Sequence, residues 1–149
     1  FTQEYFEKKF KRKYYFIPYG SEVKEPPTAS PILDKLGIRS GKYILFVGRF
    51  IPDKGVHLLV RAFEAVKTEM KLVLVGGSPN PGTYEHEIHQ AKDSRIIFAG
   101  YVYGDDTNFL MKNAFVYAQP SLIEGLSPVI LTVMGLGTPQ PQCVSCCRR

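Results

Sequence analysis

The chain has 149 residues, enough to bury one hydrophobic core, so we expect one domain with a small part of another. Its formal net charge is +5, yet residues 25–147 hold eleven basic and eleven acidic side chains, and the excess lies in residues 1–24 and at Arg148 and Arg149. Because a nucleic-acid-binding face needs positive charge clustered on the folded body, this distribution argues against nucleic acid as a partner.

Targeting and membrane-spanning segments are not visible in the sequence. The first residue is Phe1 and not Met, and no apolar run reaches the length of a transmembrane helix. We therefore expect a soluble piece of a longer protein, in the cytoplasm or at the inner face of a membrane.

The cysteines and histidines do not form a recognisable metal site. The three cysteines all fall in residues 143–147 and supply at most half of a zinc site. A zinc-binding helix needs the pattern H-E-x-x-H, and after His86 and Glu87 the second histidine is replaced by Gln90. We expect no metal and no cofactor.

The first predicted element is a short helix over residues 3–13. Phe6 and Phe10 fall on one stripe, with five basic residues around them. This pattern is typical of a solvated helix packed by two aromatic rings, and it also allows peripheral contact with a membrane surface.

The next segments lead toward a more regular region. Residues 14–17 read as a strand that residues 18–20 end, and residues 24–31 are rich in proline and read as a linker. Residues 32–36 allow one helical turn, closed by Gly37.

From residue 42 onward, short apolar runs alternate with amphipathic ones. The predicted strands are residues 43–47, 71–75, 95–99 and 115–118, and the predicted helices are residues 56–67, 84–92, 105–113 and 128–136. This alternation predicts an α/β fold, a Rossmann-like parallel sheet with helices on both faces. In such sheets ligands bind outside the carboxyl ends of the strands.

The loop after the first of these strands carries two cations. It runs from Gly48 to Gly55 and lacks the fingerprints of dinucleotide-binding and ATP-binding loops. Arg49 and Lys54 lie in it at the predicted rim of the sheet, where a diphosphate would suit them. The alternative is that both side chains are simply solvated.

The stretch from Gln119 to Gly137 reads as a strand end, an acidic turn and an apolar helix. Glu124 lies in the turn, and Ser127 followed by Pro128 reads as an N-cap followed by the first helical position. A carboxylate beside the free N–H groups of a helix start suits a phosphorylated sugar. The alternative is that Glu124 only stabilises the turn. The helix is apolar nearly all round, so we expect it to be buried.

Four motifs in order carry a resemblance to a known family: GRFIPDKGVHLLVRAF, KLVLVGG, RIIFAGYV and PSLIEGLSPVILTVMGLGTP. Over residues 14–139 the chain resembles the donor-binding half of retaining GT-B glycosyltransferases of the family-four, or group 1, type. The resemblance implies that residues 1–20 end an acceptor domain and form its hinge, that residues 21–41 are a linker, and that residues 42–139 are the donor domain.

The resemblance also implies roles for individual residues. Arg49 and Lys54 would hold the donor diphosphate, Glu124 would contact the donor sugar, and backbone groups at Tyr101 and Val102 would contact the base. The implied catalytic residues are Arg49, Lys54 and Glu124. The implied donor-binding residues are Gly48, Arg49, Lys54, Tyr101, Val102, Glu124, Gly125, Leu126, Ser127 and Thr132.

The sequence departs from the family pattern in two places. Thr132 stands where the family has a second glutamate, which grips the ribose hydroxyls; losing that charge-assisted bond costs roughly 1–2 kcal/mol. Residues 140–149, QPQCVSCCRR, do not read as the strand that the family has there. We interpret this tail as atypical, from a shifted reading frame or an artificial end, so that the domain is truncated at its C-terminus.

These observations predict a glycosyltransferase fragment that binds a UDP-, GDP- or ADP-linked sugar. Transfer with retention to an unknown acceptor would belong to the intact protein, because GT-B chemistry occurs between two domains. Two alternatives stay open. One is a non-catalytic nucleotide-sugar-binding module, and the other is an epimerase or phosphorylase built on the same scaffold.

Overall fold

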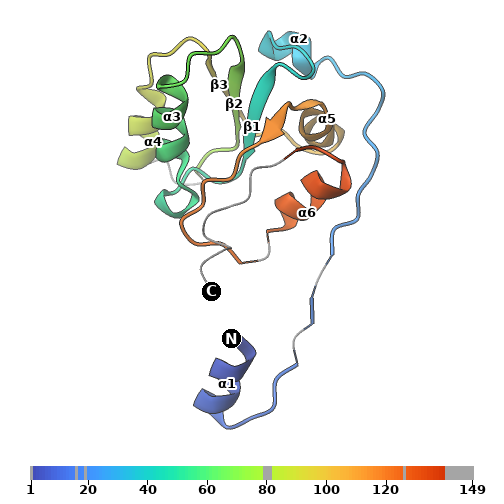
Figure 1. The fold of residues 1–149 in the computed structure, drawn as a ribbon, viewed down its shortest axis with the longest axis vertical. Helices are drawn as coiled ribbons and strands as arrows, with labels where there is room; N and C mark the ends of the chain where they lie inside the picture. The colour runs from blue at the N-terminus through green and yellow to red at the C-terminus, as the bar shows by residue number, and fades with distance from the viewer. Residues whose placement is uncertain (1, 16, 19, 79–81, 126, 140–149) are drawn as a thin grey trace.

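The computed structural model describes residues 2–15, 17–18, 20–78, 82–125 and 127–139. Its centre is a parallel sheet of four strands in the order β3-β2-β1-β4 (Figure 1). The strands are β1 (Tyr43–Val47), β2 (Lys71–Val75), β3 (Ile96–Gly100) and β4 (Val116–Tyr117). All four lie within or beside the runs that the sequence predicts, which confirms the parallel α/β fold.

Helices cover both faces of the sheet, as predicted. The helical segments are α1 (Thr2–Phe10), α2 (Ile32–Leu36), η1 (Pro52–Lys54), α3 (Val56–Glu64), α4 (Thr83–His89), α5 (Asp105–Asn113) and α6 (Pro128–Gly135). The buried residues form two clusters: one joins the sheet to α3 and α4, and the other joins it to α2, α5 and α6. Neighbouring residues of one strand point to opposite clusters, Leu45 to the second and Phe46 to the first.

The helix predicted for residues 56–67 ends at Glu64, because the Arg95 side chain binds the backbone of the residues that follow. The Arg95 guanidinium donates to the carbonyl oxygens of Val66 and Thr68 at 2.7 and 3.0 Å, and it lies 4.7 Å from the ring centre of Phe63. Asp93 holds this guanidinium in place at 2.5 Å. Hydrogen bonds from Arg95, with its charge, lower the pKa of Asp93 to about 2.

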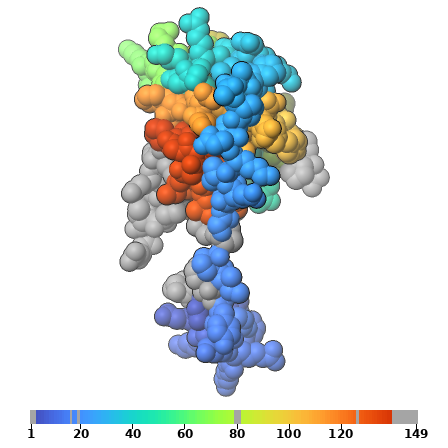
Figure 2. Space-filling model, turned by 90° about the vertical axis from the view of Figure 1, so that its right-hand side faces the viewer, coloured from blue at the N-terminus to red at the C-terminus, as the bar shows by residue number. Residues whose placement is uncertain are grey.

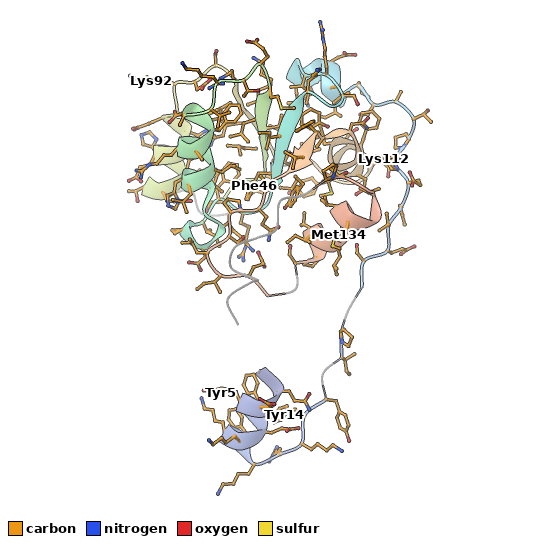
Figure 3. All side chains as sticks on the ribbon, viewed as in Figure 1. Tyr5, Tyr14, Phe46, Lys92, Lys112 and Met134 are labelled. Carbon is orange, nitrogen blue, oxygen red and sulfur yellow. The ribbon has the colours of Figure 1, made fainter. Side chains whose placement is uncertain are left out.

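The strand predicted for residues 14–17 is wrong for the described residues 14, 15 and 17, which belong to no strand. This segment lies beside α1, apart from the sheet, so it has no neighbouring strand to pair with (Figure 3). Tyr14 instead packs against α1, 5.8 Å from the ring centre of Phe6. The helix is also shorter than predicted, since it ends at Phe10, before Lys11 with its positive φ of 50°.

Helix α6 is less buried than its apolar sequence predicts. Val133 is fully buried, but Met134 on the outer side is 59% exposed. Figure 3 shows Met134 on the outer part of the body, away from Phe46 at the centre of the sheet. Within the described residues, the outer side of α6 is covered only in part, by the linker that precedes α2.

Candidate functional site

The candidate site lies where the connections from two neighbouring strands diverge. The loop after β1 leads to α3 on one face of the sheet, and the turn after β4 leads to α6 on the other face. Such a switch point opens a crevice at the carboxyl ends of the strands, where ligands bind in open α/β sheets. The loop residues 48–55 and the described turn residues 118–125 and 127 both lie at this edge.

Close backbone contact joins the loop to the turn. The amide of Leu122 donates to the carbonyl oxygen of Asp53 at 2.8 Å. Gly55 has a φ of +65°, and a Cβ added to it would lie 2.3 Å from the carbonyl oxygen of Pro120. Position 55 therefore requires glycine both for its left-handed backbone and for this approach.

Lys54 of the loop and Glu124 of the turn form an ion pair. The ammonium of Lys54 donates to Oε2 of Glu124 at 2.6 Å, and the same oxygen accepts from the side chains of Gln119 at 2.6 Å and Ser121 at 3.1 Å. Within the described residues, the other carboxylate oxygen, Oε1, accepts no hydrogen bond. One oxygen is thus saturated, while the other is available to a ligand.

The carboxylate of Glu124 is held in its charged form. Its side chain is only 11% exposed. Burial acts to raise the pKa of Glu124, but the hydrogen bonds from Lys54, Ser121 and Gln119 and the charge of Lys54 outweigh it, so the pKa lies below its ordinary value. A charged carboxylate accepts hydrogen bonds only, which suits it to sugar hydroxyls.

A second layer of side chains holds Gln119. The Tyr117 hydroxyl lies 3.0 Å from Oε1 of Gln119 and 3.2 Å from the carbonyl oxygen of Val47, to either of which it donates. The hydroxyl of Ser127 lies 3.4 Å from the same Gln119 oxygen. Sequence reasoning missed Gln119 and Ser121 as site residues and assigned them to the end of a strand. The sequence feature that could have identified them is their position: both are polar residues that come directly after a buried parallel strand.

Arg49 is at the same rim but touches neither Lys54 nor Glu124 at hydrogen-bond distance. Its side chain is exposed and, among the described residues, makes no hydrogen bond or ion pair. Gly48 before it donates its amide to Val75 at 3.0 Å and lies against Gly76, where an added Cβ would be 2.0 Å from the Gly48 oxygen. The backbone below Arg49 is therefore fixed, while its guanidinium is available.

Tyr101 and Val102 lie at the carboxyl end of β3, which is separated from β4 by two strands. The Tyr101 ring is 52% exposed and stacks on Tyr103 with 6.0 Å between ring centres. The carbonyl oxygen of Val102 accepts from the Thr107 hydroxyl at 2.7 Å. These two residues share the edge of the sheet with the crevice, but they are not in contact with Glu124.

The start of α6 is capped as the sequence predicts. The hydroxyl of Ser127 accepts from the amide of Ile130 at 3.5 Å, and Pro128 is the first helical residue. Gly125 is exposed in the turn, and Leu126 lies outside the described residues. Thr132, one turn into the helix, has its hydroxyl 2.6 Å from that of Ser21 in the linker.

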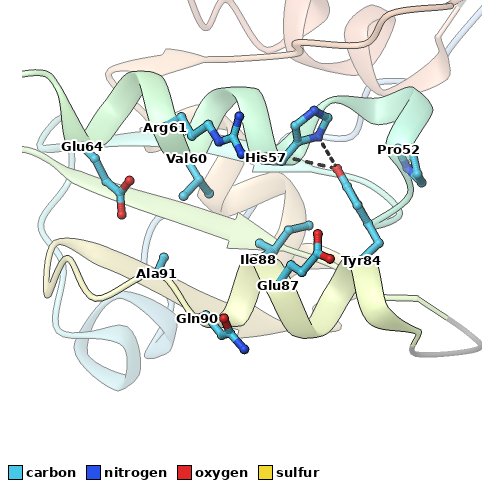
Figure 4. Close-up of a pocket in the computed structure, with 10 residues that line it drawn as sticks. All are labelled: Pro52, His57, Val60, Arg61, Glu64, Tyr84, Glu87, Ile88, Gln90 and Ala91. Atoms are coloured by element: carbon cyan, nitrogen blue, oxygen red, sulfur yellow. Dashed lines mark hydrogen bonds between the residues drawn. The ribbon is translucent and has the colours of Figure 1, made fainter.

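A groove of about 440 Å³ lies elsewhere, between α3 and α4 (Figure 4). The Tyr84 hydroxyl crosses it to His57, 2.8 Å from Nδ1. Of the loop after β1, only Pro52 lines this groove, and Arg49, Lys54 and Glu124 do not. The groove is therefore distinct from the crevice.

The described part of the chain holds neither a cluster of metal-ligating side chains nor a membrane-spanning helix. There, no group of three or more His, Cys, Asp and Glu side chains is placed to hold a metal ion. In the same residues, none of the helices has the length and apolar character needed to cross a bilayer.

Comparisons with known proteins point to one family. Residues 41–140 match the glycosyl transferases group 1. The chain is 36% identical over 101 residues to an uncharacterized glycosyltransferase of Methanocaldococcus jannaschii, which covers 66% of this chain and 26% of that protein. It is 29% identical over 145 residues to O-antigen chain mannosyltransferase C of Escherichia coli, which covers 88% of this chain and 38% of that protein.

Solved structures agree with this match. Anabaena HepE in complex with UDP-glucose aligns with a TM-score of 0.66 and 26% identity over 73% of this chain and 31% of that one. The chain thus spans between a quarter and two fifths of the length of these three proteins, at 26%, 38% and 31%. Because the family match covers well over half of its residues, the chain belongs to the group 1 glycosyltransferases.

Proposed function

We propose that this chain binds the nucleotide-diphosphate sugar from which the whole protein transfers a glycosyl group. The observation that carries the proposal is the Glu124 carboxylate, whose Oε2 accepts from three donors while its Oε1 accepts from none among the described residues. A buried, charged carboxylate with one unengaged oxygen is suited to bind a hydroxyl of the donor sugar. The binding of UDP-glucose by the related HepE supports a donor of this class.

The diphosphate would lie between the loop after β1 and the turn after β4. Lys54 uses one of its three N–H donors on Glu124 and retains two, and Arg49 retains its whole guanidinium. Both cations would offset the charge that builds on the leaving nucleotide as the glycosidic bond breaks. The capped start of α6 adds amides and the positive end of a helix dipole next to the same turn.

Transfer itself is proposed for the whole protein, with retention of the anomeric configuration and with an acceptor that the site does not define. The nucleotide of the donor, UDP, GDP or ADP, stays open. Tyr101 and Val102 offer an aromatic ring and backbone groups, and neither selects one base by hydrogen bonds from its side chain. The anomeric proton coupling in the first-formed product of the whole protein tests retention.

The substitution Glu124→Gln tests the sugar contact. Its amide oxygen still accepts from Lys54, Gln119 and Ser121 in place of Oε2, and the NH₂ group replaces Oε1 by a donor. Affinity for the sugar conjugate is therefore expected to fall about tenfold relative to the free nucleotide, whose affinity stays within about twofold. Calorimetric titration with both ligands measures the ratio.

Glu64→Gln is the matched control, because it removes the same charge from an exposed position on α3. It should change neither affinity. An unchanged ratio of the two affinities in Glu124→Gln would contradict the assignment of Glu124 to the sugar.

A further inference from the structure

Residues 21–30, which connect α1 to the α/β domain, are in contact with that domain. Figure 2 shows this segment lying on the surface of the body beside α6. Its far end is fixed by Ser30, whose hydroxyl donates to Asp106 of α5 at 2.5 Å and accepts from the amide of Ile32 at 3.1 Å. Its near end is fixed by Ser21, whose hydroxyl lies next to that of Thr132 in α6.

The near end is held by a hydroxyl pair. The Thr132 hydroxyl lies 3.1 Å from the Pro128 carbonyl oxygen, one turn back, and 2.6 Å from the hydroxyl of Ser21. A carbonyl oxygen accepts only, so Thr132 donates to Pro128 and Ser21 donates to Thr132. The single proton of the Thr132 hydroxyl is thus used within its own helix, and its oxygen is used by the linker.

Packing adds to this contact one turn further along α6. Val23 is half-buried and packs against the core cluster that contains Val133 and Leu136. Gly135 makes room for it, since a Cβ added there would lie 2.2 Å from Cγ2 of Val23. An ion pair between Glu25 and Lys112 of α5 follows, with both side chains well exposed, and such pairs contribute little.

We propose that residues 21–25 form a strap on α6, and that Ser21, Thr132 and Gly135 are positioning residues that hold it. The strap fixes the point at which residues 1–20 join the domain relative to α6, the helix that begins just after Glu124. It also assigns Thr132 to the linker and not to the ribose. The assignment of Thr132 rests on the proposed function, because it concerns the donor ribose. The contact between the strap and α6 does not depend on that function.

Trypsin cleavage after Lys24 reports whether the strap is docked. Lys24 is exposed inside the strap, but a protease needs several residues on each side of the bond to detach from the body. Ser21→Ala and Thr132→Val each remove the hydroxyl pair, and each should speed this cleavage about threefold to tenfold. Cleavage after Lys13, beyond the strap, is the internal reference and should not change.

The pair acts as a unit, so the double variant should be cleaved no faster than the faster single variant. Ser40→Ala is the matched control: its hydroxyl donates to Asn113 at 2.9 Å, away from the strap, and its removal should leave Lys24 cleavage unchanged. Equal cleavage rates at Lys24 in the unsubstituted chain and in both single variants would overturn the proposal.

Gly135→Ala tests the packing contact without removing a hydrogen bond. Alanine favours a helix more than glycine does, so the melting temperature should not fall. The added methyl group displaces Val23, so cleavage after Lys24 should accelerate as in Ser21→Ala. A Gly135→Ala variant that keeps its melting temperature and its slow cleavage would show that Val23 does not hold the strap.

Nucleotide titration separates the strap from the donor site. In the Ser21→Ala background, where the strap is already released, adding Thr132→Val should leave nucleotide affinity within about twofold. A further tenfold loss would assign Thr132 to the ribose and overturn its role as a strap residue. Because the digestion uses no ligand, failure of the strap and failure of the proposed donor site give different results.

Discussion

The substitution Gly55→Ala is expected to lower the free energy of unfolding by about 3 kcal/mol and to abolish nucleotide binding. Two costs combine at this position. A φ of +65° strains any residue with a Cβ, and the Cβ would lie 2.3 Å from the Pro120 carbonyl oxygen. The loop and the turn must therefore move away from each other, and this movement separates Lys54 from Glu124.

Gly41→Ala is the matched control for this effect. Gly41 has nearly the same φ, +69°, but nothing lies within 4 Å of its added Cβ. It should therefore cost only the backbone strain, about 1 kcal/mol, and should leave nucleotide affinity unchanged. Urea unfolding measures both decreases in the free energy of unfolding. Equal decreases for the two variants would show that the close approach to Pro120 contributes nothing to the effect of Gly55→Ala.

The substitution Arg49→Ala is expected to weaken binding of the free nucleotide diphosphate about tenfold to a hundredfold. A charge-assisted hydrogen bond to a phosphate contributes roughly 1.5–3 kcal/mol. Arg49 is exposed and has no partner among the described residues, so the melting temperature should stay the same. The loss should shrink at high salt, because counterions screen an exposed cation.

Arg39→Ala controls for the change in net charge. Arg39 is also exposed, but it precedes β1, at the opposite end of the strand from Arg49. Its removal should change affinity less than twofold. If both variants weaken the nucleotide equally, the binding reflects overall charge and not a site at the carboxyl ends of the strands.

The sheet and its switch point are predictable from the sequence because they depend on local pattern. Apolar runs of four or five residues, alternating with amphipathic runs, specify buried parallel strands, and the loops after β1 and β4 then fall at one edge. Lys54 and Glu124 could be placed together on that basis, 70 residues apart. The resemblance to a family added their roles, which pattern alone does not supply.

Other features depend on contacts between distant residues. The end of α3 at Glu64 is set by Arg95. Residues 14–17 have strand-like sequence, but the described ones, 14, 15 and 17, have no strand of the described sheet beside them. Gln119 and Ser121 became site residues only through the direction of their side chains toward Glu124. The contact of Thr132 with Ser21 joins residues 111 positions apart, and no local pattern predicts it.

Calorimetric titration of the unsubstituted chain with UDP, GDP and ADP tests the central claim most directly. Our account predicts that the folded chain binds one of the three with a stoichiometry of about one, since Arg49, Lys54 and the capped start of α6 all lie at one edge of the sheet. Circular dichroism on the same sample establishes that the chain is folded. A folded chain that binds none of the three nucleotides would contradict the account.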